Sequence, residues 1–368
     1  MTDFENNSYL VPIPKYAVWA ITPKGRILAG KIRQRLDSAD CHIPLHLKGH
    51  DDHCVGFENF KAHVLSSFCH YKGHIFIMAT GIVIRIITPL IKDKTVDPAV
   101  VVLDEKCNHC ISLLSGHLGG ANELARQVAQ IVGAVPVITT ATDANDVPSI
   151  ELIAEELDLV IENPAAIKFI NMGFLRKETI EVLDPFRFLR DSLPAAMFTR
   201  YFRTIHSHPA PSPTGERGDA QPLIYVGDEI KELPPACLVL RPRILVAGIG
   251  CNRGTGKEEI NGFLYEVLHK HKLSVMSLCR LATIDIKKDE KALVLLAKEL
   301  HLPIIFYSSE ELNRVKGLQS PSRLVRKHTG VESVCEAAAL LGAKTTQLLV
   351  AKQVAKNVTV AVARTVCM

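Results

Sequence analysis

The stretch Ser-Gly-His-Leu-Gly-Gly-Ala-Asn, residues 115–122, decides the fold of the first third of the chain. An apolar strand pattern precedes it at residues 110–114, and a helical pattern follows it through residue 132, so its glycines stand where the backbone turns from strand to helix. A further apolar run, residues 135–138, ends in the polar sequence Thr-Thr-Ala-Thr-Asp, residues 139–143. Because ligands of α/β proteins bind at the carboxyl ends of strands, both polar segments are candidate binding elements.

Short β-branched runs alternate with helical patterns outward from this stretch in both directions. Residues 18–21 predict a first strand, and residues 99–103 form a predicted hairpin with residues 110–114. Residues 244–247 predict a strand that runs into a second glycine-rich turn, followed by a helix to about residue 270. This alternation predicts an α/β fold with two three-layer α/β/α-type domains and mainly parallel sheets, joined by a less regular α/β middle region.

The expected boundaries follow the changes of pattern. We expect an N-terminal α/β domain over residues 1–143, a middle region over residues 144–242 and a C-terminal α/β domain over residues 243–368. Within the middle region, residues 206–222 are rich in Pro, Ser, Gly and charge, which predicts an exposed linker.

Composition excludes several classes of protein. With 47% hydrophobic residues among 368, the chain can bury real cores, so it is not a disordered protein. Its net charge of +4 is too small to indicate a nucleic-acid partner. No run reaches the roughly 20 apolar residues of a membrane helix, and the start lacks the pattern of a secretory signal. We therefore expect a cytoplasmic protein whose ten cysteines form no structural disulfides.

The first glycine-rich turn is a candidate reaction site. Its backbone leaves the first N–H groups of the next helix free to receive an anion, and His117 is the only titratable side chain in it. Asp143, at the polar strand end, is a candidate general base or orienting group. The competing interpretations are a plain connector with an exposed histidine, and an aspartate that only caps the following helix.

The second glycine-rich turn, from Gly248 to Gly254, resembles a dinucleotide-binding turn only weakly. The acidic residue that would bind a ribose about 20 positions later is missing, and the nearest strand-associated acid is Asp285. The phosphate-loop pattern is missing as well, so neither NAD nor ATP is supported. A helix N-terminus with Arg253 and Thr255 remains as a receptor for a carboxylate or phosphate.

Two later segments carry further candidates. Asp285 and Lys287 lie in a predicted loop before a helix start, where charged residues often serve function. Ser333 and Glu336 lie one turn apart at the start of an alanine-rich helix, for which a solvated helix face is the alternative interpretation.

Two clusters of metal-ligand residue types are discounted. Cys107 and Cys110 have metal-like spacing, but no second such pair exists and they bracket a predicted hairpin turn. Pro44 and Gly49 interrupt any helix that could bring the four nearby histidines onto one face. Those histidines are His42, His46, His50 and His53. We predict no metal site, although the sequence alone leaves this histidine cluster open.

Several motifs occur together in one order along nearly the whole chain. They include Met-Ala-Thr-Gly-Ile-Val-Ile-Arg (78–85), the sequence Ile-Ser-Leu-Leu-Ser-Gly-His-Leu-Gly-Gly-Ala-Asn-Glu (111–123), Pro-Val-Ile-Thr-Thr-Ala-Thr-Asp (136–143), Gly-Ile-Gly-Cys (248–251), Ala-Thr-Ile-Asp (282–285) and Gly-Val-Glu-Ser-Val (330–334). In this order they resemble the cobalt-precorrin-5A hydrolase family of anaerobic cobalamin biosynthesis. That family commonly has Arg-Arg-Gly after the motif cysteine, where this chain has Asn252, Arg253 and Gly254, so Arg253 is the residue that carries over.

The resemblance implies a hydrolase that opens a δ-lactone of a cobalt-containing macrocycle with water and releases the C20 fragment as acetaldehyde. For this reaction we hypothesise that His117 is the general base or acid, that Asp143 orients it, and that Glu123 is a weaker alternative base. Cys251 as a covalent nucleophile is less favoured, because the sequence shows no partner base. The expected substrate-binding residues are Gly81, Arg85, Ser115, Gly116, Gly119, Gly120, Asn122, Thr140, Gly250, Cys251, Arg253, Gly254, Thr255, Asp285, Lys287, Ser333, Glu336 and Lys352.

The resemblance also sets expectations for cofactors and partners. Cobalt arrives inside the substrate, so no dissociable cofactor is expected, and the partners are cobalt-precorrin-5A and water. The two glycine-rich turns are expected to face a cleft between the N- and C-terminal domains. A homodimer and transient contact with neighbouring corrinoid enzymes remain open. The alternative function is a non-catalytic corrinoid-binding or handover module that acts with a partner enzyme.

Overall fold

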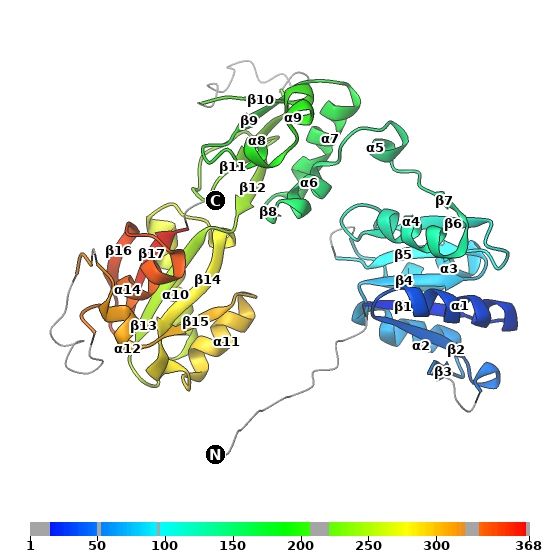
Figure 1. The fold of residues 1–368 in the computed structure, drawn as a ribbon, viewed down its shortest axis with the longest axis horizontal. Helices are drawn as coiled ribbons and strands as arrows, with labels where there is room; N and C mark the ends of the chain where they lie inside the picture. The colour runs from blue at the N-terminus through cyan, green and yellow to red at the C-terminus, as the bar shows by residue number, and fades with distance from the viewer. Residues whose placement is uncertain are drawn as a thin grey trace. The chain divides into compact units, whose positions relative to one another are not determined.

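The computed structural model describes residues 15–49, 53–93, 96–206, 221–316, 318–320 and 331–365 (Figure 1). Most of the predicted linker, residues 207–220, and His50 lie outside this part of the chain. The chain divides into two compact units, Met1–Leu152 and Ile153–Met368. The second unit contains two sheets, and the first contains one.

The first unit is built on a seven-stranded sheet in the order β3-β2-β1-β4-β5-β6-β7. All neighbours in it are parallel except β5 and β6, which form the predicted hairpin. The strands are β1 (Tyr16–Ala20), β2 (Ala39–Pro44), β3 (Val55–Phe57), β4 (Gly73–Ile77), β5 (Ala99–Leu103), β6 (His109–Leu114) and β7 (Val135–Val137).

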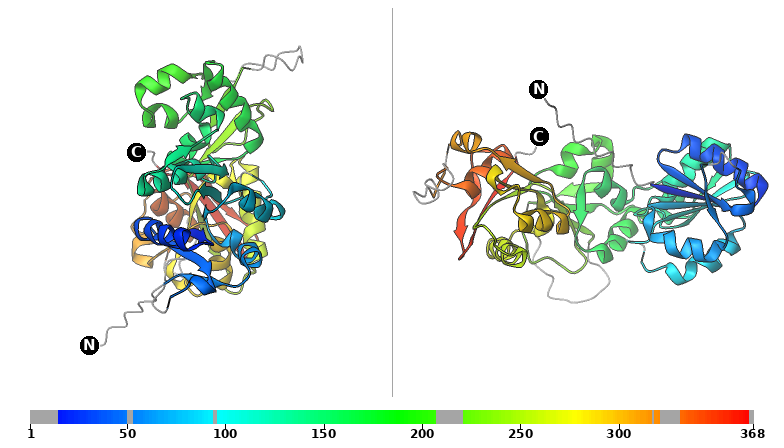
Figure 2. Two further views of the ribbon diagram at one scale, coloured as in Figure 1. Left: turned by 90° about the vertical axis from the view of Figure 1, so that its right-hand side faces the viewer. Right: turned by 90° about the horizontal axis from the view of Figure 1, so that it is seen from below.

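Helices cover both faces of this sheet, as Figure 2 shows. On one face, α1 (Pro23–Arg35) and α4 (Ala121–Val132) bury a core against alternate strand residues such as Val18. On the other face, α2 (Phe60–Ser67) and α3 (Thr80–Ile87) pack on an aromatic core around Trp19. The short helix α5 (Ala141–Ala144) follows β7. These three layers confirm the predicted α/β/α architecture.

The β5–β6 hairpin reverses the chain direction within the sheet. Because β6 and β7 run opposite to β4, their carboxyl ends lie at the edge of the sheet opposite to the carboxyl end of β4. The turn after β6 carries Ser115 and His117, whereas Gly81 lies in the first turn of α3, the helix that follows β4. These two predicted binding elements therefore lie at opposite edges of one sheet.

The middle region contains a five-stranded sheet in the order β10-β9-β11-β12-β8, in which only β8 is antiparallel to its neighbour. The sequence predicts a less regular region here. The strands that the structure shows are only three to five residues long, which is too short to give a clear sequence pattern. They are β8 (Leu159–Ile161), β9 (Ile180–Leu183), β10 (Phe202–Thr204), β11 (Leu223–Val226) and β12 (Leu238–Pro242). The helices of this region are α6 (Ile150–Glu156), α7 (Ile167–Leu175), α8 (Phe188–Ser192) and α9 (Ala195–Tyr201).

The C-terminal sheet has the order β15-β14-β13-β17-β16. Strands β13 (Leu245–Cys251), β14 (Leu278–Ile284) and β15 (Ile304–Tyr307) are parallel, and β17 (Val358–Arg364) runs antiparallel to both β13 and β16 (Leu348–Val354). On one face lie α10 (Lys257–Lys270) and α11 (Lys291–Glu299); on the other lie α12 (Ser309–Asn313) and α14 (Val334–Ala343). This domain also has three layers.

The motif Gly-Ile-Gly-Cys lies inside β13, which corrects the prediction that these glycines form the turn. The turn itself comes later, and Gly254 has a left-handed φ of 77° there. Gly248 is required by packing, since a Cβ at this position would lie 1.9 Å from the carbonyl oxygen of Cys335 in α14. Helix α14 can approach β13 this closely only over glycine.

No helix among the described residues is both long and apolar enough to cross a membrane.

Candidate functional site

The turn at residues 115–122 satisfies its own backbone. Ser115 and Gly120 have left-handed φ angles of 59° and 81°, which folds the turn back onto the start of α4. Three N–H groups there donate to carbonyl oxygens of the same turn: Gly120 to His117, Ala121 to Ser115 and Asn122 to Gly116, at 2.9, 3.0 and 3.0 Å. This corrects the prediction that these N–H groups are free to receive an anion.

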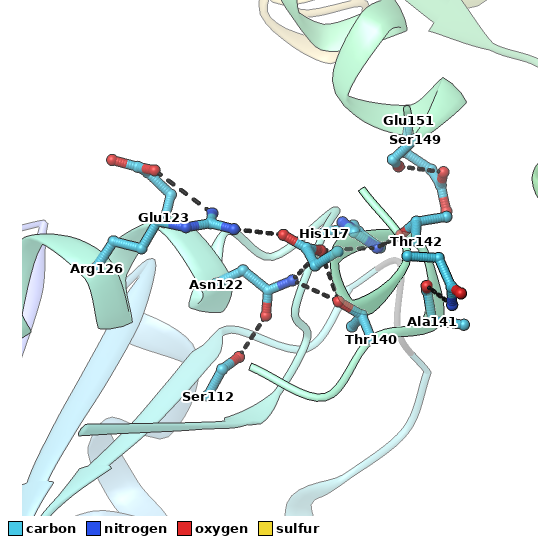
Figure 3. A network of polar contacts seen from close by, with 12 residues as sticks. Ser112, His117, Asn122, Glu123, Arg126, Thr140, Ala141, Thr142, Ser149 and Glu151 are labelled. Carbon is cyan, nitrogen blue, oxygen red and sulfur yellow. Dashed lines mark hydrogen bonds and ion pairs between the residues drawn. The ribbon is translucent and has the colours of Figure 1, made fainter. Parts of the chain in front are cut away.

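The side chain of His117 points toward α5, the short helix that follows β7 (Figure 3). Its Nε2 lies 2.8 Å from Thr142 Oγ1 and 3.7 Å from Asp143 Oδ2. The side chain is 14% exposed, and its Nδ1 is buried without a hydrogen-bond partner among the described residues. The structure thus brings together His117 and Asp143, as predicted, and adds a hydroxyl that the sequence analysis did not select.

Asp143 is held as an ionised carboxylate. It accepts hydrogen bonds from Thr140 Oγ1 at 2.6 Å, from Asn122 Nδ2 at 3.0 Å and from the guanidinium of Arg126. Burial alone would raise the pKa of Asp143, but the bonds from Thr140 and Arg126 and the charges of His117 and Arg126 outweigh it and lower this pKa. A carboxylate that resists protonation suits an orienting group better than a general base.

Two residues of this network were missed by the sequence analysis besides Thr142. Ser112 donates to Asn122 Oδ1 at 2.7 Å and so fixes the direction in which that amide presents its Nδ2 to Asp143. Arg126 lies one helical turn after Asn122 on α4. Residues spaced one turn apart share a helix face, so a basic residue one turn after Asn122 could have been recognised as a partner for Asp143.

Glu123, the weaker candidate base, points away from His117 (Figure 3). Its side chain is 63% exposed, lies 3.8 Å from Arg126 and accepts a hydrogen bond from Gln127 at 3.0 Å. The structure therefore does not bring Glu123 to the imidazole.

A second cluster forms a pocket of about 500 Å³ in the C-terminal domain. Five predicted substrate-binding residues line it: Gly250, Cys251, Arg253, Lys287 and Lys352. Lys356 and Asn357, in the turn between β16 and β17, line it too and were not predicted. Gly254 and Thr255 lie in the adjoining turn before α10.

Two of the cations in this pocket are paired with acids at its margin. Arg253 NH1 lies 2.8 Å from Asp289, and Lys287 Nζ lies 3.4 Å from Glu290. Burial raises the pKa of the Cys251 thiol; the positive charge of Lys287 offsets part of this increase, and the charge of Glu290 adds to it. A neutral thiol is a poor nucleophile, which weighs against covalent catalysis by Cys251.

Other predicted residues lie elsewhere. Ser333 and Glu336 are fully buried at the start of α14, which corrects the alternative of a solvated helix face. Asp285 begins a short turn after β14 and does not line the pocket. Arg85 is exposed on α3, with Gly81 one turn before it.

Neither discounted cluster gathers metal ligands in the described part of the chain. His42 instead stacks on Trp19 with ring centroids 4.1 Å apart, and its Nδ1 lies 3.1 Å from His63 Nε2. Cys107 sits in the hairpin turn with a left-handed φ of 58°, and Cys110 is buried in β6.

Three family models match the chain in sequence. Residues 62–143 match the model described as Cobalamin synthesis G N-terminal, residues 148–242 match the Cobalamin biosynthesis central region, and residues 245–363 match the Cobalamin synthesis G C-terminus. Together they cover more than half of the chain.

Similar proteins extend over almost its full length. A solved structure of a cobalamin biosynthesis protein G homolog from Sulfolobus solfataricus is 24% identical, with a TM-score of 0.34, over 95% of this chain and 96% of that one. The cobalt-precorrin-5A hydrolase of Priestia megaterium is 34% identical over 95% of this chain and 94% of its own length. That of Salmonella typhimurium is 32% identical over 88% and 91%. This chain therefore belongs to the cobalt-precorrin-5A hydrolase family.

Proposed function

We propose that this protein hydrolyses cobalt-precorrin-5A. Water opens the δ-lactone that joins C20 to the ring A acetate, and the two-carbon C20 fragment leaves as acetaldehyde, which gives cobalt-precorrin-5B. One observation carries the proposal. Relatives named cobalt-precorrin-5A hydrolase match nearly the whole chain, at up to 34% identity.

The reaction needs a group that takes a proton from water as it attacks the lactone carbonyl, and one that returns a proton to the leaving oxygen. We assign both roles to His117. An imidazole that gains a proton becomes positively charged, and the carboxylate of Asp143, 3.7 Å from Nε2, would stabilise that charge. Thr142 would hold the ring in place through its 2.8 Å contact.

The substrate also carries carboxylates around the rim of its macrocycle. The pocket of the C-terminal domain supplies Arg253, Lys287 and Lys352 for them, and Arg85 supplies an exposed cation on α3. Cobalt enters as part of the substrate, so the proposal includes no dissociable cofactor.

The test is an anaerobic incubation of the purified, metal-stripped protein with cobalt-precorrin-5A. Acetaldehyde and a matching loss of mass in the corrinoid product are expected. Tight binding of the corrinoid without acetaldehyde would contradict the proposal and favour the handover module.

The residue assignment has its own test. His117→Ala should cut turnover severely while corrinoid binding stays within a few-fold of the unmodified protein. Near-normal turnover of this variant would remove His117 from the mechanism.

A further inference from the structure

Strand β16 carries a β-bulge at the edge of the C-terminal sheet. Val350 pairs with Val362 and Gln353 pairs with Val360, so Ala351 and Lys352 together stand opposite one residue of β17. A bulge takes one N–H group out of the ladder and changes the direction of a side chain, and bulges are common beside binding sites.

The N–H group of Lys352 is taken up by a buried carboxylate. It donates to Oε1 of Glu336 at 3.0 Å, while Oε2 of Glu336 accepts from the N–H groups of Gln319 and Ser320 at 2.9 and 3.0 Å. The Glu336 side chain is 0% exposed. A buried carboxylate is costly unless it is well hydrogen-bonded, and these three backbone donors meet that need. Glu336 thus ties α14 to the bulge.

Lys352 and Cys335 both line the pocket of the C-terminal domain. Burial raises the pKa of the Cys335 thiol; a hydrogen bond with Thr359 and then the positive charge of Lys352 act to lower it, and the negative charge of Glu336 acts to raise it. The charges of Lys352 and Glu336 therefore act with opposite sign on a thiol that lines the pocket.

The charges in this pocket do not balance. No acidic side chain is among its lining residues in the described structure. Arg253 and Lys287 have acidic partners at the margin, but no salt bridge in the described part of the chain involves Lys352 or Lys356. Two positive charges thus remain at one side of the pocket, which favours a ligand with more than one negative charge.

We propose that this pocket binds carboxylate groups on the rim of the corrinoid, and that Glu336 is a positioning residue that directs Lys352 into it. The identity of the ligand rests on the proposed function. The anion preference and the role of Glu336 rest on the bulge, the buried carboxylate and the charges alone.

The ligand preference can be tested without turnover. Cobyrinic acid carries free carboxylates on a corrin ring, and its heptamethyl ester has the same ring without those charges. We expect the full-length protein to bind the acid at least tenfold more tightly, and Lys352→Met to weaken binding of the acid about tenfold. The control Lys298→Met removes an exposed lysine of α11 outside the pocket and should change nothing. Equal binding of acid and ester, or normal binding by Lys352→Met, would overturn the proposal.

The role of Glu336 is tested by a double-mutant cycle. Glu336→Gln should weaken binding of cobyrinic acid about as much as Lys352→Met, and the double variant should bind no more weakly than Lys352→Met alone. Additive losses would show that Glu336 does not act through Lys352. Thermal unfolding checks that each variant folds, and Glu336→Asp replaces Glu336→Gln in the cycle should the latter not fold.

These outcomes separate the pocket from the reaction. In the catalytic assay, Lys352→Met should raise KM and leave kcat nearly unchanged. A protein that binds cobyrinic acid as described but releases no acetaldehyde would refute the hydrolase and leave the pocket standing. A protein that releases acetaldehyde but binds acid and ester equally would refute the pocket alone.

Discussion

Thr142 Oγ1 lies 2.8 Å from Nε2 of His117, whereas the carboxylate of the next residue, Asp143, lies 3.7 Å from the same nitrogen. The hydroxyl is therefore the direct hydrogen-bond partner of the ring, and the carboxylate acts on it through its charge. Thr142 is 5% exposed, so its rotamer is restrained by packing. His117 is thus held by a neutral hydroxyl, while the negative charge of the nearby Asp143 carboxylate acts on its imidazole ring.

Removal of the Thr142 hydroxyl should loosen the imidazole. We expect Thr142→Val, which keeps the shape of the side chain, to lower kcat about tenfold to a hundredfold, below the total contribution of a general base. Thr142→Ser should restore most of the activity because it keeps the hydroxyl. Steady-state kinetics of acetaldehyde release measures both variants. Equal activity of the valine and serine variants would show that the hydroxyl has no role.

Arg126 should control the pH range over which Asp143 stays charged. Its hydrogen bond and its charge help to lower the pKa of Asp143 against the effect of burial, so Arg126→Ala should raise this pKa. Activity requires the charged form in our mechanism, and the loss of kcat on acidification should therefore begin at a higher pH in this variant. Arg126→Lys, which keeps the charge, is the control. Identical acid limbs for the alanine variant and the unmodified protein would contradict the assignment.

Much of the fold could be predicted from the spacing of apolar residues and from the residue types at helix starts and turns. The start of α1 carries two such signals: Pro23 is its first residue, and the Thr22 side chain accepts a hydrogen bond from Gly25 N at 3.1 Å. The hairpin of β5 and β6 also follows from its pattern. The strands of the middle region were too short for a clear period of two, since three residues show only one alternation.

The site was predicted in part, because long-range contacts leave little trace in a single sequence. His117 and Asp143 stand out as polar residues after strands, but Arg126 meets Asp143 only through the packing of α4 beside the β7 loop. Glu336 was expected to touch substrate, yet its carboxylate binds backbone N–H groups 16 and 17 residues away in sequence. Sequence patterns show where a charge lies and not which partner neutralises it.

Gly248 should tolerate no side chain. A Cβ there would lie 1.9 Å from Cys335 O and 2.7 Å from Ala339 N, both in the backbone of α14. Gly248→Ala must push the helix away from β13, at a cost of about 3 kcal/mol or more in the free energy of unfolding. Gly262, in the middle of α10, has open space around its Cα, so Gly262→Ala should stabilise by about 0.5–1 kcal/mol. Calorimetric unfolding of the two variants should shift in opposite directions, and a stable Gly248→Ala protein would contradict the close approach.

Asp228 and Arg364 join the middle sheet to the C-terminal sheet within the second unit. The guanidinium binds both carboxylate oxygens, at 2.8 and 3.1 Å, and Asp228 is 1% exposed. Arg364→Ala would leave a buried carboxylate without its partner, which should destabilise the unit by about 3 kcal/mol. The exposed pair of Arg243 and Asp158, 3.9 Å apart, is the control, and Arg243→Ala should cost less than about 1 kcal/mol. Similar unfolding temperatures for the two variants would show that the buried pair does not hold the sheets together.

Acid should destabilise the first unit through its buried histidines. Burial lowers the pKa of His74 to about 4 against the effect of its bond to Phe68, and burial and then the charges of His63 and His74 lower the pKa of His42 to about 3. The ordinary value of both groups is 6.5, so the unfolded chain binds these two protons at a higher pH than the folded one.

The stability that these histidines confer is therefore complete above pH 6.5 and is lost as the pH falls toward 4 for His74 and toward 3 for His42. Two protons correspond to a limiting slope of about 2.7 kcal/mol per pH unit in the free energy of unfolding. His42→Asn removes one of them, so its slope between pH 6 and 5 should be about half as steep, although the variant also loses the ring that stacks on Trp19. His109→Asn, at an exposed position before the core of β6, should keep the full slope. Urea unfolding followed by the fluorescence of Trp19 measures all three proteins, and equal slopes for His42→Asn and the unmodified protein would show that His42 is not the group that acid must protonate.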